Sequence, residues 1–233
     1  MQTITIRIPP DFDQATIATL KRVMPFTMTS VERISSFCDA VKYVTTNNIA
    51  GDIVECGVWK GGSMMAAALT LQSLDDLSRE LYLFDTFEGM PTPADNDVSY
   101  SGESGMGFTA NLKPDGSGSD FCRATIDQVR DAVGSVGYPA NKIHFVKGKV
   151  EDTLPHHAPD RIAILRLDTD WYESTRHELI HLYPRLVPRG VLIIDDYGHW
   201  QGARQAVDEY IRDNQVPLLL NRIDYTGRIA VKP

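Results

Sequence analysis

The stretch from residue 162 to residue 197 constrains the fold of this chain more than any other part of the sequence. It contains two apolar runs, at 162–167 and 191–194, separated by a segment at 173–186 whose apolar residues recur at helical spacing. This order predicts a strand, a helix and a second strand. A connection that contains a helix makes its two strands parallel, so the stretch predicts a parallel pair within an α/β fold.

A pair of aspartates follows each of these predicted strands. Asp168 and Asp170 follow the first strand, and Asp195 and Asp196 follow the second. Both pairs are expected at the carboxyl ends of parallel strands, where open α/β sheets bind ligands. Carboxylates that converge there repel one another, and their hard oxygen atoms suit Mg²⁺, Mn²⁺ or Ca²⁺. The alternative is that they are solvated strand ends, with Asp170 as a helix cap.

The composition limits the classes of protein to which the chain can belong. Its 233 residues, 42% of them apolar, suffice for one domain with a sizeable core, and its net charge of −8 argues against a nucleic-acid partner. No apolar run is long enough to span a bilayer and no signal peptide opens the sequence, so no membrane partner is expected. The odd set Cys38, Cys56 and Cys122 lacks metal-type spacing and predicts free thiols in a reducing cytoplasm.

The segment GDIVECGVWKGGS predicts the first unit of a nucleotide-type site. A strand at 53–54, a turn at 55–57 and a helix start at 61–63 follow one another. Glycine lets the backbone approach a ligand closely, and the helix start offers free N–H groups. A second strand is predicted at 81–84 and ends at Asp85, where an acidic residue is placed to bind ribose hydroxyls. Glycines in such turns also serve packing alone, so this pattern is weak by itself.

The rest of the chain predicts an arm, a lid and the remaining strands. Residues 1–25 are expected to form an N-terminal arm, with alternating isoleucines at its start, ahead of a domain at 26–233. Residues 88–121 are rich in Gly, Ser, Pro and Asp, and predict a mobile lid or else a disordered insertion. Further strands are expected at 143–146, and at 218–220 paired antiparallel with 228–231.

Several of these segments resemble the macrocin O-methyltransferase (TylF-type) family. The resemblance runs from about residue 28 to about residue 210 and rests on MTSVER, DIVECGVWKGGS, LYLFDTFEGMP, LRLDTDWYEST and GVLIIDDYGHWQGARQAVDEY. It implies a Rossmann-like class I methyltransferase fold, with a mostly parallel seven-stranded sheet, its last strand reversed, and helices on both faces. It also implies S-adenosyl-L-methionine and Mg²⁺ as cofactors, a sugar or glycosylated natural product as substrate, and a homodimer.

The resemblance further implies roles for individual residues. The implied cofactor contacts are Thr29, Glu55, Gly57, Ser63, Asp85, Lys149, Val150, Glu151 and Asp168. Among these, Ser63 would hold the methionine carboxylate, Asp85 the ribose hydroxyls, and residues 149–151 would frame the adenine. The implied metal ligands are Asp168, Asp195 and Asp196.

The catalytic base stays open at this point. In some relatives a Lys or His three residues after the first metal aspartate acts as the base, whereas Trp171 occupies that position here. The base is then Asp168 or Asp170, or the metal alone lowers the pKa of the substrate hydroxyl. His199, which follows the second aspartate pair, is a further candidate. Four aromatic residues are candidates to stack on a sugar, or else belong to the core: Trp171, Tyr172, Tyr197 and Trp200.

Three other functions compete with sugar O-methylation. The same fold could methylate a phenol or catechol, or could bind S-adenosylmethionine without catalysis as the partner of a glycosyltransferase. A dinucleotide-dependent oxidoreductase is the third, and the absence of a G-x-G-x-x-G motif argues against it.

Overall fold

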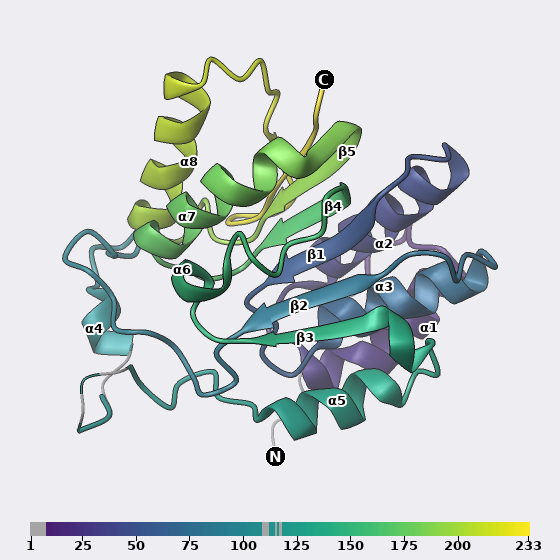
Figure 1. The fold of residues 1–233 in the computed structure, drawn as a ribbon, viewed down its shortest axis with the longest axis horizontal. Coiled ribbons are helices and arrows are strands. Elements are labelled where there is room, and N and C mark those ends of the chain that lie inside the picture. Colours follow the sequence, from purple (N-terminus) through teal and green to yellow (C-terminus); the bar gives the residue numbers. More distant parts are fainter. Residues whose placement is uncertain (1–7, 109–111, 115, 117) are drawn as a thin grey trace.

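The computed structural model describes residues 8–108, 112–114, 116 and 118–233. One seven-stranded sheet runs through it, with the strand order β3-β2-β1-β4-β5-β7-β6 (Figure 1). The strands are β1 Asp52–Cys56, β2 Leu81–Asp85, β3 Ile143–Lys147, β4 Ile162–Leu167, β5 Leu186–Ile194, β6 Asn221–Arg222 and β7 Arg228–Val231. The α-helices are α1 Gln14–Val23, α2 Val31–Thr46, α3 Gly62–Ser73, α4 Gly105–Phe108, α5 Ile126–Gly134, α6 Val150–Thr153, α7 Tyr172–Leu182 and α8 Gln201–Asp213.

The topology confirms the predicted mostly parallel sheet with its last strand reversed. Strands β1 to β5 pair in parallel, and β7 pairs antiparallel with both β5 and β6. The chain runs outward from β1 to β3 and then crosses back to β4, which lies on the other side of β1. The loops after β1 and β4 therefore leave the sheet in opposite directions. The opening between them is where doubly wound sheets bind ligands.

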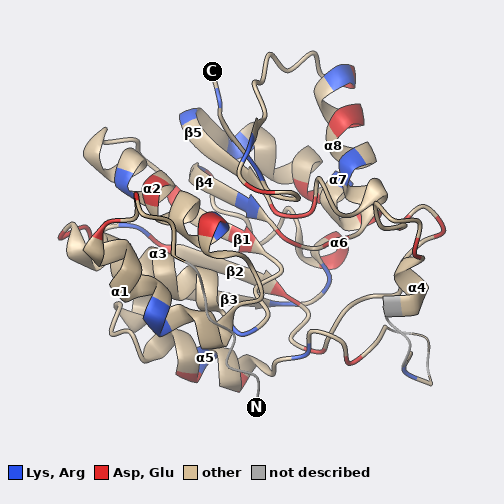
Figure 2. Cartoon of the chain, turned by 180° about the vertical axis from the view of Figure 1, so that it is seen from behind, with Lys and Arg blue, Asp and Glu red and all other residues tan. Residues whose placement is uncertain are grey.

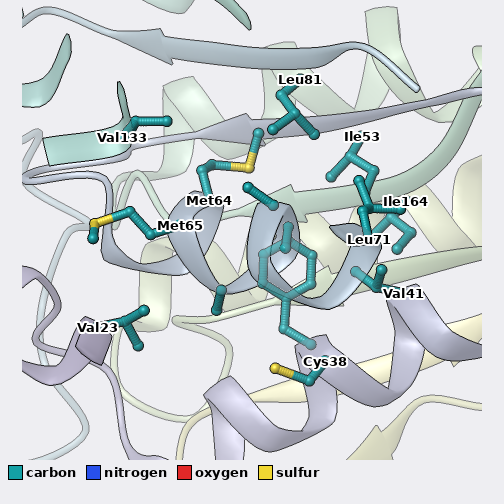
Figure 3. Close-up of a cluster of buried hydrophobic side chains, with 14 of the residues drawn as sticks. Val23, Cys38, Val41, Ile53, Met64, Met65, Leu71, Leu81, Val133 and Ile164 are labelled. Atoms are coloured by element: carbon teal, nitrogen blue, oxygen red, sulfur yellow. The ribbon is translucent and has the colours of Figure 1, made fainter. Parts of the chain in front are cut away.

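Helices cover both faces of the sheet because side chains alternate along each strand. Ile53 of β1 faces the core built with α1, α2, α3 and α5, whereas its neighbour Val54 faces the core built with α6, α7 and α8. Figure 3 shows the first core, in which Met64 and Leu71 of α3 lie close to Leu81 and Ile164 of the sheet. Strands that are buried on both faces read as continuous apolar runs, which is why the sequence predicted them well.

The structure corrects several element boundaries. The strand predicted at 218–220 is wrong, because β6 begins at Asn221 and pairs through Arg222 with Arg228. The register follows from the 223–227 turn, in which the Ile223 N–H donates to the Gly227 carbonyl. The turn predicted at 55–57 begins later, since Glu55 and Cys56 still belong to β1.

The N-terminal segment lies partly outside the described residues. Ile4 and Ile6 of the predicted arm are among the residues not described. Helix α1 packs on the domain, with Leu20 and Val23 buried in the first core. The boundary at residue 25 stays a prediction. Across the described ranges, no helix has the length and apolar character needed to cross a bilayer.

The segment 88–121, predicted as a lid, lies with α4 at the edge of the sheet where the parallel strands end (Figure 1). Asp97 within it is buried and accepts hydrogen bonds from the N–H groups of Ala94 and Tyr172, both at 2.8 Å. The Trp171 indole N–H donates to the Pro91 carbonyl at 3.1 Å. The first part of the segment is thus attached to the start of α7. Movement as a lid stays a prediction, and residues 109–111, 115 and 117 lie outside the described part.

Gly57 allows the loops after β1 and β4 to approach closely. It has a φ of +80°, and a Cβ atom at this position would lie 1.9 Å from the carbonyl oxygen of Asp168. We expect Gly57→Ala to lower the free energy of unfolding by roughly 2–5 kcal/mol, because it adds both backbone strain and a clash. Urea unfolding measures this loss.

The matched control is Gly134→Ala at the end of α5, where an added Cβ would meet no atom within 4 Å. It should leave the protein as stable or more stable, by up to about 1 kcal/mol. Equal unfolding curves for the two variants would contradict the close approach at Gly57.

Candidate functional site

Three of the predicted aspartates meet where β4 and β5 end. Asp168, Asp195 and Asp196, here called the acidic triad, each offer a carboxylate oxygen, and these oxygens all lie within 4.8 Å of one another. Asp195 and Asp196 are buried and Asp168 is half-buried. The two strands are parallel neighbours, with Leu167 paired to Ile194, so their ends coincide.

A buried ion pair lies directly beneath the triad. Figure 2 shows that β4 carries a positively charged segment. The only charged residue of this strand is Arg166, which pairs in register with Glu55 of β1. Their side chains are 2% and 0% exposed and bond to each other. The Arg166 guanidinium also donates to Asp168 at 2.6 Å and to Asp195 at 2.5 Å. One cation therefore connects the ends of β1, β4 and β5.

The protonation states follow from this arrangement. Burial alone would lower the pKa of Arg166, but Asp168, Asp195 and Glu55 raise it well above its ordinary value, so the guanidinium stays charged. Burial raises the pKa of Glu55, and Arg166 and the Ser63 hydroxyl oppose that shift. A buried ion pair is stable only when further hydrogen bonds compensate for the lost hydration, and the Ser63 hydroxyl supplies one to Glu55.

The MTSVER motif supplies a second cation to the triad. Arg33 of α2 bonds through Nη1 to Asp195, and its Nε donates to Asp224 at 2.9 Å. The Ser30 hydroxyl, which also caps α2, donates to Asp224 at 2.8 Å. The Thr29 hydroxyl donates to Asp195 at 3.3 Å. The motif thus attaches the start of α2 to one triad carboxylate and to the turn before β7.

Asp170 and Asp196 receive no such compensation. In the part of the chain that the structure describes, neither forms an ion pair with Lys or Arg. Burial raises the pKa of Asp170 to about 6, and burial together with the neighbouring carboxylates raises that of Asp196 well above its ordinary value. Asp196 accepts the Asp170 N–H at 3.1 Å, and Asp170 accepts the Trp200 indole N–H at 2.7 Å. A further cation would stabilise the ionised forms of this pair.

The donor set fits a hard divalent cation. All three triad ligands are carboxylate oxygens, the type that Mg²⁺, Mn²⁺ and Ca²⁺ prefer. Oxygens in one Mg²⁺ shell lie about 2.1 Å from the ion and hence no more than about 4 Å apart, so small side-chain movements would close the triad around an ion. The excess of carboxylates over guanidinium groups leaves negative charge for the ion to neutralise.

A pocket opens beside the triad between the loops after β1, β2, β3 and β4. Six of the nine predicted cofactor residues line it, namely Gly57, Asp85, Lys149, Val150, Glu151 and Asp168. Asp170 lines it as well. Asp85 connects two of these loops, since its carboxylate accepts the N–H groups of Val58 and Trp59 after β1, at 2.8 and 3.1 Å, and of Phe87 after β2, at 2.7 Å. The loops that the sequence predicted to bind one ligand therefore enclose one space.

The other three predicted cofactor residues lie outside that lining. Glu55 and Ser63 bond to each other beneath the triad, and Thr29 bonds to Asp195. Residues 148–152, predicted as a turn beside the adenine, contain helix α6, with Lys149 as its N-cap.

The aromatic candidates divide by burial. Trp171 and Trp200 are buried and pack edge to face with ring centres 4.8 Å apart, which favours the core interpretation for both. Tyr172 and Tyr197 donate their hydroxyls to Glu209 and Asp208 of α8, each at 2.7 Å. His199 lies in the loop after β5, where burial and the charge of Arg33 lower its pKa.

Sequence reasoning missed Arg166 and Arg33. The run at 162–167 counted as apolar although it contains an arginine. An arginine inside a strand buried on both faces needs a carboxylate partner, and Asp168 two residues later points to the same face of the strand. That spacing could have identified Arg166. The distant partners of Arg33 leave no comparable signal in the sequence.

The geometry agrees with comparisons against known proteins. The family described as Macrocin-O-methyltransferase (TylF) matches residues 9–231. The chain is 31% identical over 227 residues to the 8-demethyl-8-(2,3-dimethoxy-alpha-L-rhamnosyl)-tetracenomycin-C 4'-O-methyltransferase of Streptomyces olivaceus, covering 97% of this chain and 83% of the relative. It is 32% identical to the demethyldecarbamoylnovobiocin O-methyltransferase of Streptomyces niveus, covering 86% and 73%. The solved O-methyltransferase NovP superposes with a TM-score of 0.78 at 30% identity, covering 89% of this chain and 82% of that one.

Substitutions of Glu55 and Arg166 should have strongly coupled effects on the free energy of unfolding. Arg166→Met leaves the Glu55 carboxylate buried without its cation and should lower the free energy of unfolding by about 3–5 kcal/mol. The double variant Glu55→Gln with Arg166→Met removes both charges and should recover part of that loss. Urea unfolding of both single variants and the double variant measures the coupling.

Arg212→Met removes an exposed arginine paired with Asp213 on α8 and serves as the control. It should leave unfolding unchanged. If the loss of unfolding free energy in the double variant equalled the sum of the losses in the two single variants, that result would contradict a direct interaction between Glu55 and Arg166.

Proposed function

Since this chain belongs to the macrocin O-methyltransferase (TylF) family and is an O-methyltransferase, we propose that it methylates a hydroxyl of a glycoside with S-adenosylmethionine as donor. The observation that carries the proposal is the pocket that joins four strand-end loops directly to the acidic triad. The name of the relative from Streptomyces olivaceus gives a rhamnosyl-bearing compound as its substrate, and a glycoside acceptor is proposed here as well. Unpaired cysteines are consistent with a cytoplasmic location, which we propose together with a homodimer.

The pocket is proposed to hold the methyl donor. Asp85 would bind the ribose hydroxyls, because its carboxylate lies at the end of β2 and lines the pocket. Residues 149–151 would frame the adenine from the loop after β3. Gly57 lines the pocket at the point where the loops after β1 and β4 approach each other closely. Glu55 would contribute indirectly, because it bonds Arg166 below the triad, and Ser63 would support it by donating its hydroxyl to Glu55.

The triad is proposed to hold a divalent cation, with Asp168, Asp195 and Asp196 as its ligands. Such an ion lowers the pKa of a bound sugar hydroxyl, which is otherwise far too high for ionisation near neutral pH. Arg166 and Arg33 hold Asp168 and Asp195 in place through direct bonds. Methyl transfer is an in-line displacement, so the chain's largest further contribution is to hold donor and acceptor at the correct distance.

Asp170 is proposed as the proton acceptor. Trp171 occupies the position at which the family resemblance implies a Lys or His. Asp168 and Asp170 line the pocket whereas His199 is not part of its lining, which favours the two aspartates over His199. Asp168 is engaged by Arg166, whereas Asp170 lines the pocket and burial raises its pKa to about 6. A base with a pKa near the working pH accepts protons effectively.

The metal assignment predicts the behaviour of Asp196→Asn. The variant should lose Mg²⁺-stimulated methyl transfer by about 100-fold or more, because the ion's contribution is worth several kcal/mol. Its affinity for S-adenosylhomocysteine should stay within about twofold of the wild type. Transfer of labelled methyl to a glycoside panel after chelation and Mg²⁺ titration measures the rate, and calorimetry measures binding. Asp213→Asn, an exposed change on α8, is the control, and a full Mg²⁺-stimulated rate in Asp196→Asn would contradict the assignment.

The ribose assignment predicts a different pattern for Asp85→Asn. Losing a charge-assisted hydrogen bond should weaken S-adenosylhomocysteine binding by about 1–3 kcal/mol. Calorimetry measures the affinity, and a thermal melt checks that the loop is intact. Glu88→Gln, three residues further along the same loop and exposed, should bind normally. Unchanged affinity in a folded Asp85→Asn protein would rule out the ribose contact.

A further inference from the structure

We propose that Tyr100, His199 and Tyr225, here called the aromatic cluster, form the binding surface for the flat, apolar part of the acceptor glycoside. This inference rests on the proposed function and specifies the acceptor side of the same site. It differs from the aromatic set predicted from sequence, whose two tryptophans are buried against each other.

The three rings touch one another although they come from separate parts of the chain. Tyr100 belongs to the segment after β2, His199 to the loop after β5, and Tyr225 to the turn before β7. Ring centres are 5.5 Å apart for Tyr100 and His199, 6.1 Å for Tyr100 and Tyr225, and 6.0 Å for His199 and Tyr225. All three contacts are edge to face, the arrangement that aromatic rings prefer.

The cluster is held rigidly by backbone bonds. The Tyr100 N–H donates to the His199 carbonyl at 2.7 Å, and the Gly198 N–H donates to the Thr226 carbonyl at 2.9 Å. The Tyr225 hydroxyl and the His199 Nδ1 lie 3.3 Å apart. A Cβ at Gly198 would lie 2.0 Å from the Tyr225 carbonyl oxygen, so the two loops are in close contact. Preorganised rings bind a ligand without the loss of side-chain freedom.

The same loops are bonded to two members of the acidic triad. The His199 N–H donates to the Asp196 carbonyl at 3.0 Å, and the Thr226 hydroxyl donates to the Asp195 carbonyl at 2.8 Å. Asp224, beside Tyr225, is the residue that Arg33 bridges to Asp195. The aromatic cluster is therefore continuous with the place where the acceptor hydroxyl is proposed to react. An acceptor whose hydroxyl reacts at the triad would extend from it across the aromatic cluster.

The rings are exposed in a way that packing does not explain. Tyr100 is 66% exposed and Tyr225 is 57% exposed, although both are large and in mutual contact. Rings in contact that remain open to solvent offer surface for a ligand to stack upon. Among the charged groups beside the cluster, Arg33 pairs with Asp195 and Asp224, and Arg222 donates to the Tyr225 carbonyl at 3.2 Å. The surface therefore suits a neutral glycoside with a flat aglycone or an apolar sugar face.

The test uses 4-nitrophenyl glycosides, including the α-L-rhamnoside, and the corresponding methyl glycosides as acceptors with saturating S-adenosylmethionine and Mg²⁺. We expect Tyr100→Leu and Tyr225→Leu each to raise KM for the aryl glycosides by about 3- to 10-fold, as the loss of one aromatic contact implies. The kcat values, the affinity for S-adenosylhomocysteine and KM for the methyl glycosides should change little. Tyr100→Phe and Tyr225→Phe keep the rings and should stay within about twofold of the wild type.

Leu219→Ser, which removes an exposed apolar side chain before β6, is the control and should leave every constant unchanged. If the wild type methylates the aryl glycosides but neither Tyr100→Leu nor Tyr225→Leu changes KM for them, this inference is overturned while the proposed function stands. A changed sedimentation profile with unchanged KM would assign the cluster to a contact between two copies and would also overturn it. Failure of the wild type to methylate any glycoside would instead overturn the proposed function.

Discussion

The buried ion pair between Glu55 and Arg166 is the interaction on which the rest of the site depends. It joins β1 and β4 at the point where the order of strands reverses, which is where the sheet opens for a ligand. Because Arg166 also bonds Asp168 and Asp195, its position sets theirs. A guanidinium has a planar set of donors and can serve three carboxylates at once, which the single ammonium of lysine could not do with the same geometry.

The distribution of charge separates a structural part of the site from a reactive part. Arg166 and Arg33 lie on the α2 side and form ion pairs with Glu55, Asp168, Asp195 and Asp224. Asp170 and Asp196 lie beyond the reach of both cations, and burial raises the pKa of each. The described arginines thus pair with part of the cluster, and the proposed divalent cation would stabilise the remaining carboxylates. This division explains how many acidic groups fit in one small volume without unfolding it.

The sequence predicted those parts of the structure that depend on local patterns. The strand–helix–strand unit follows from the change between strand and helix periodicity, and the meeting of Asp168 with Asp195 and Asp196 follows from the parallel connection. The partners of Arg33 could not be predicted, because Asp195 lies 162 residues and Asp224 191 residues away along the chain. The place of β6 depends on the turn before β7 rather than on the apolar residues at 218–220. Tyr225 was overlooked for the same reason, since only the folded turn brings it beside His199.

The order of the strands determines the order in which the parts of the site lie along the edge of the sheet. The pocket proposed for the methyl donor lies over the ends of β3, β2, β1 and β4, and the triad lies at the ends of β4 and β5. The aromatic cluster joins the loop after β5 to the turn before β7. Methyl donor, reacting hydroxyl and acceptor body would therefore follow one another along a single edge of the sheet. A nucleophile that attacks in line must approach the methyl group from the side opposite the sulfur, and in the proposed arrangement the acceptor would approach the donor from the β5 end of the sheet. Variation in the loops at the β5–β7 end can then change the acceptor without disturbing the donor pocket, because the Glu55–Arg166 pair fixes the boundary between the two halves.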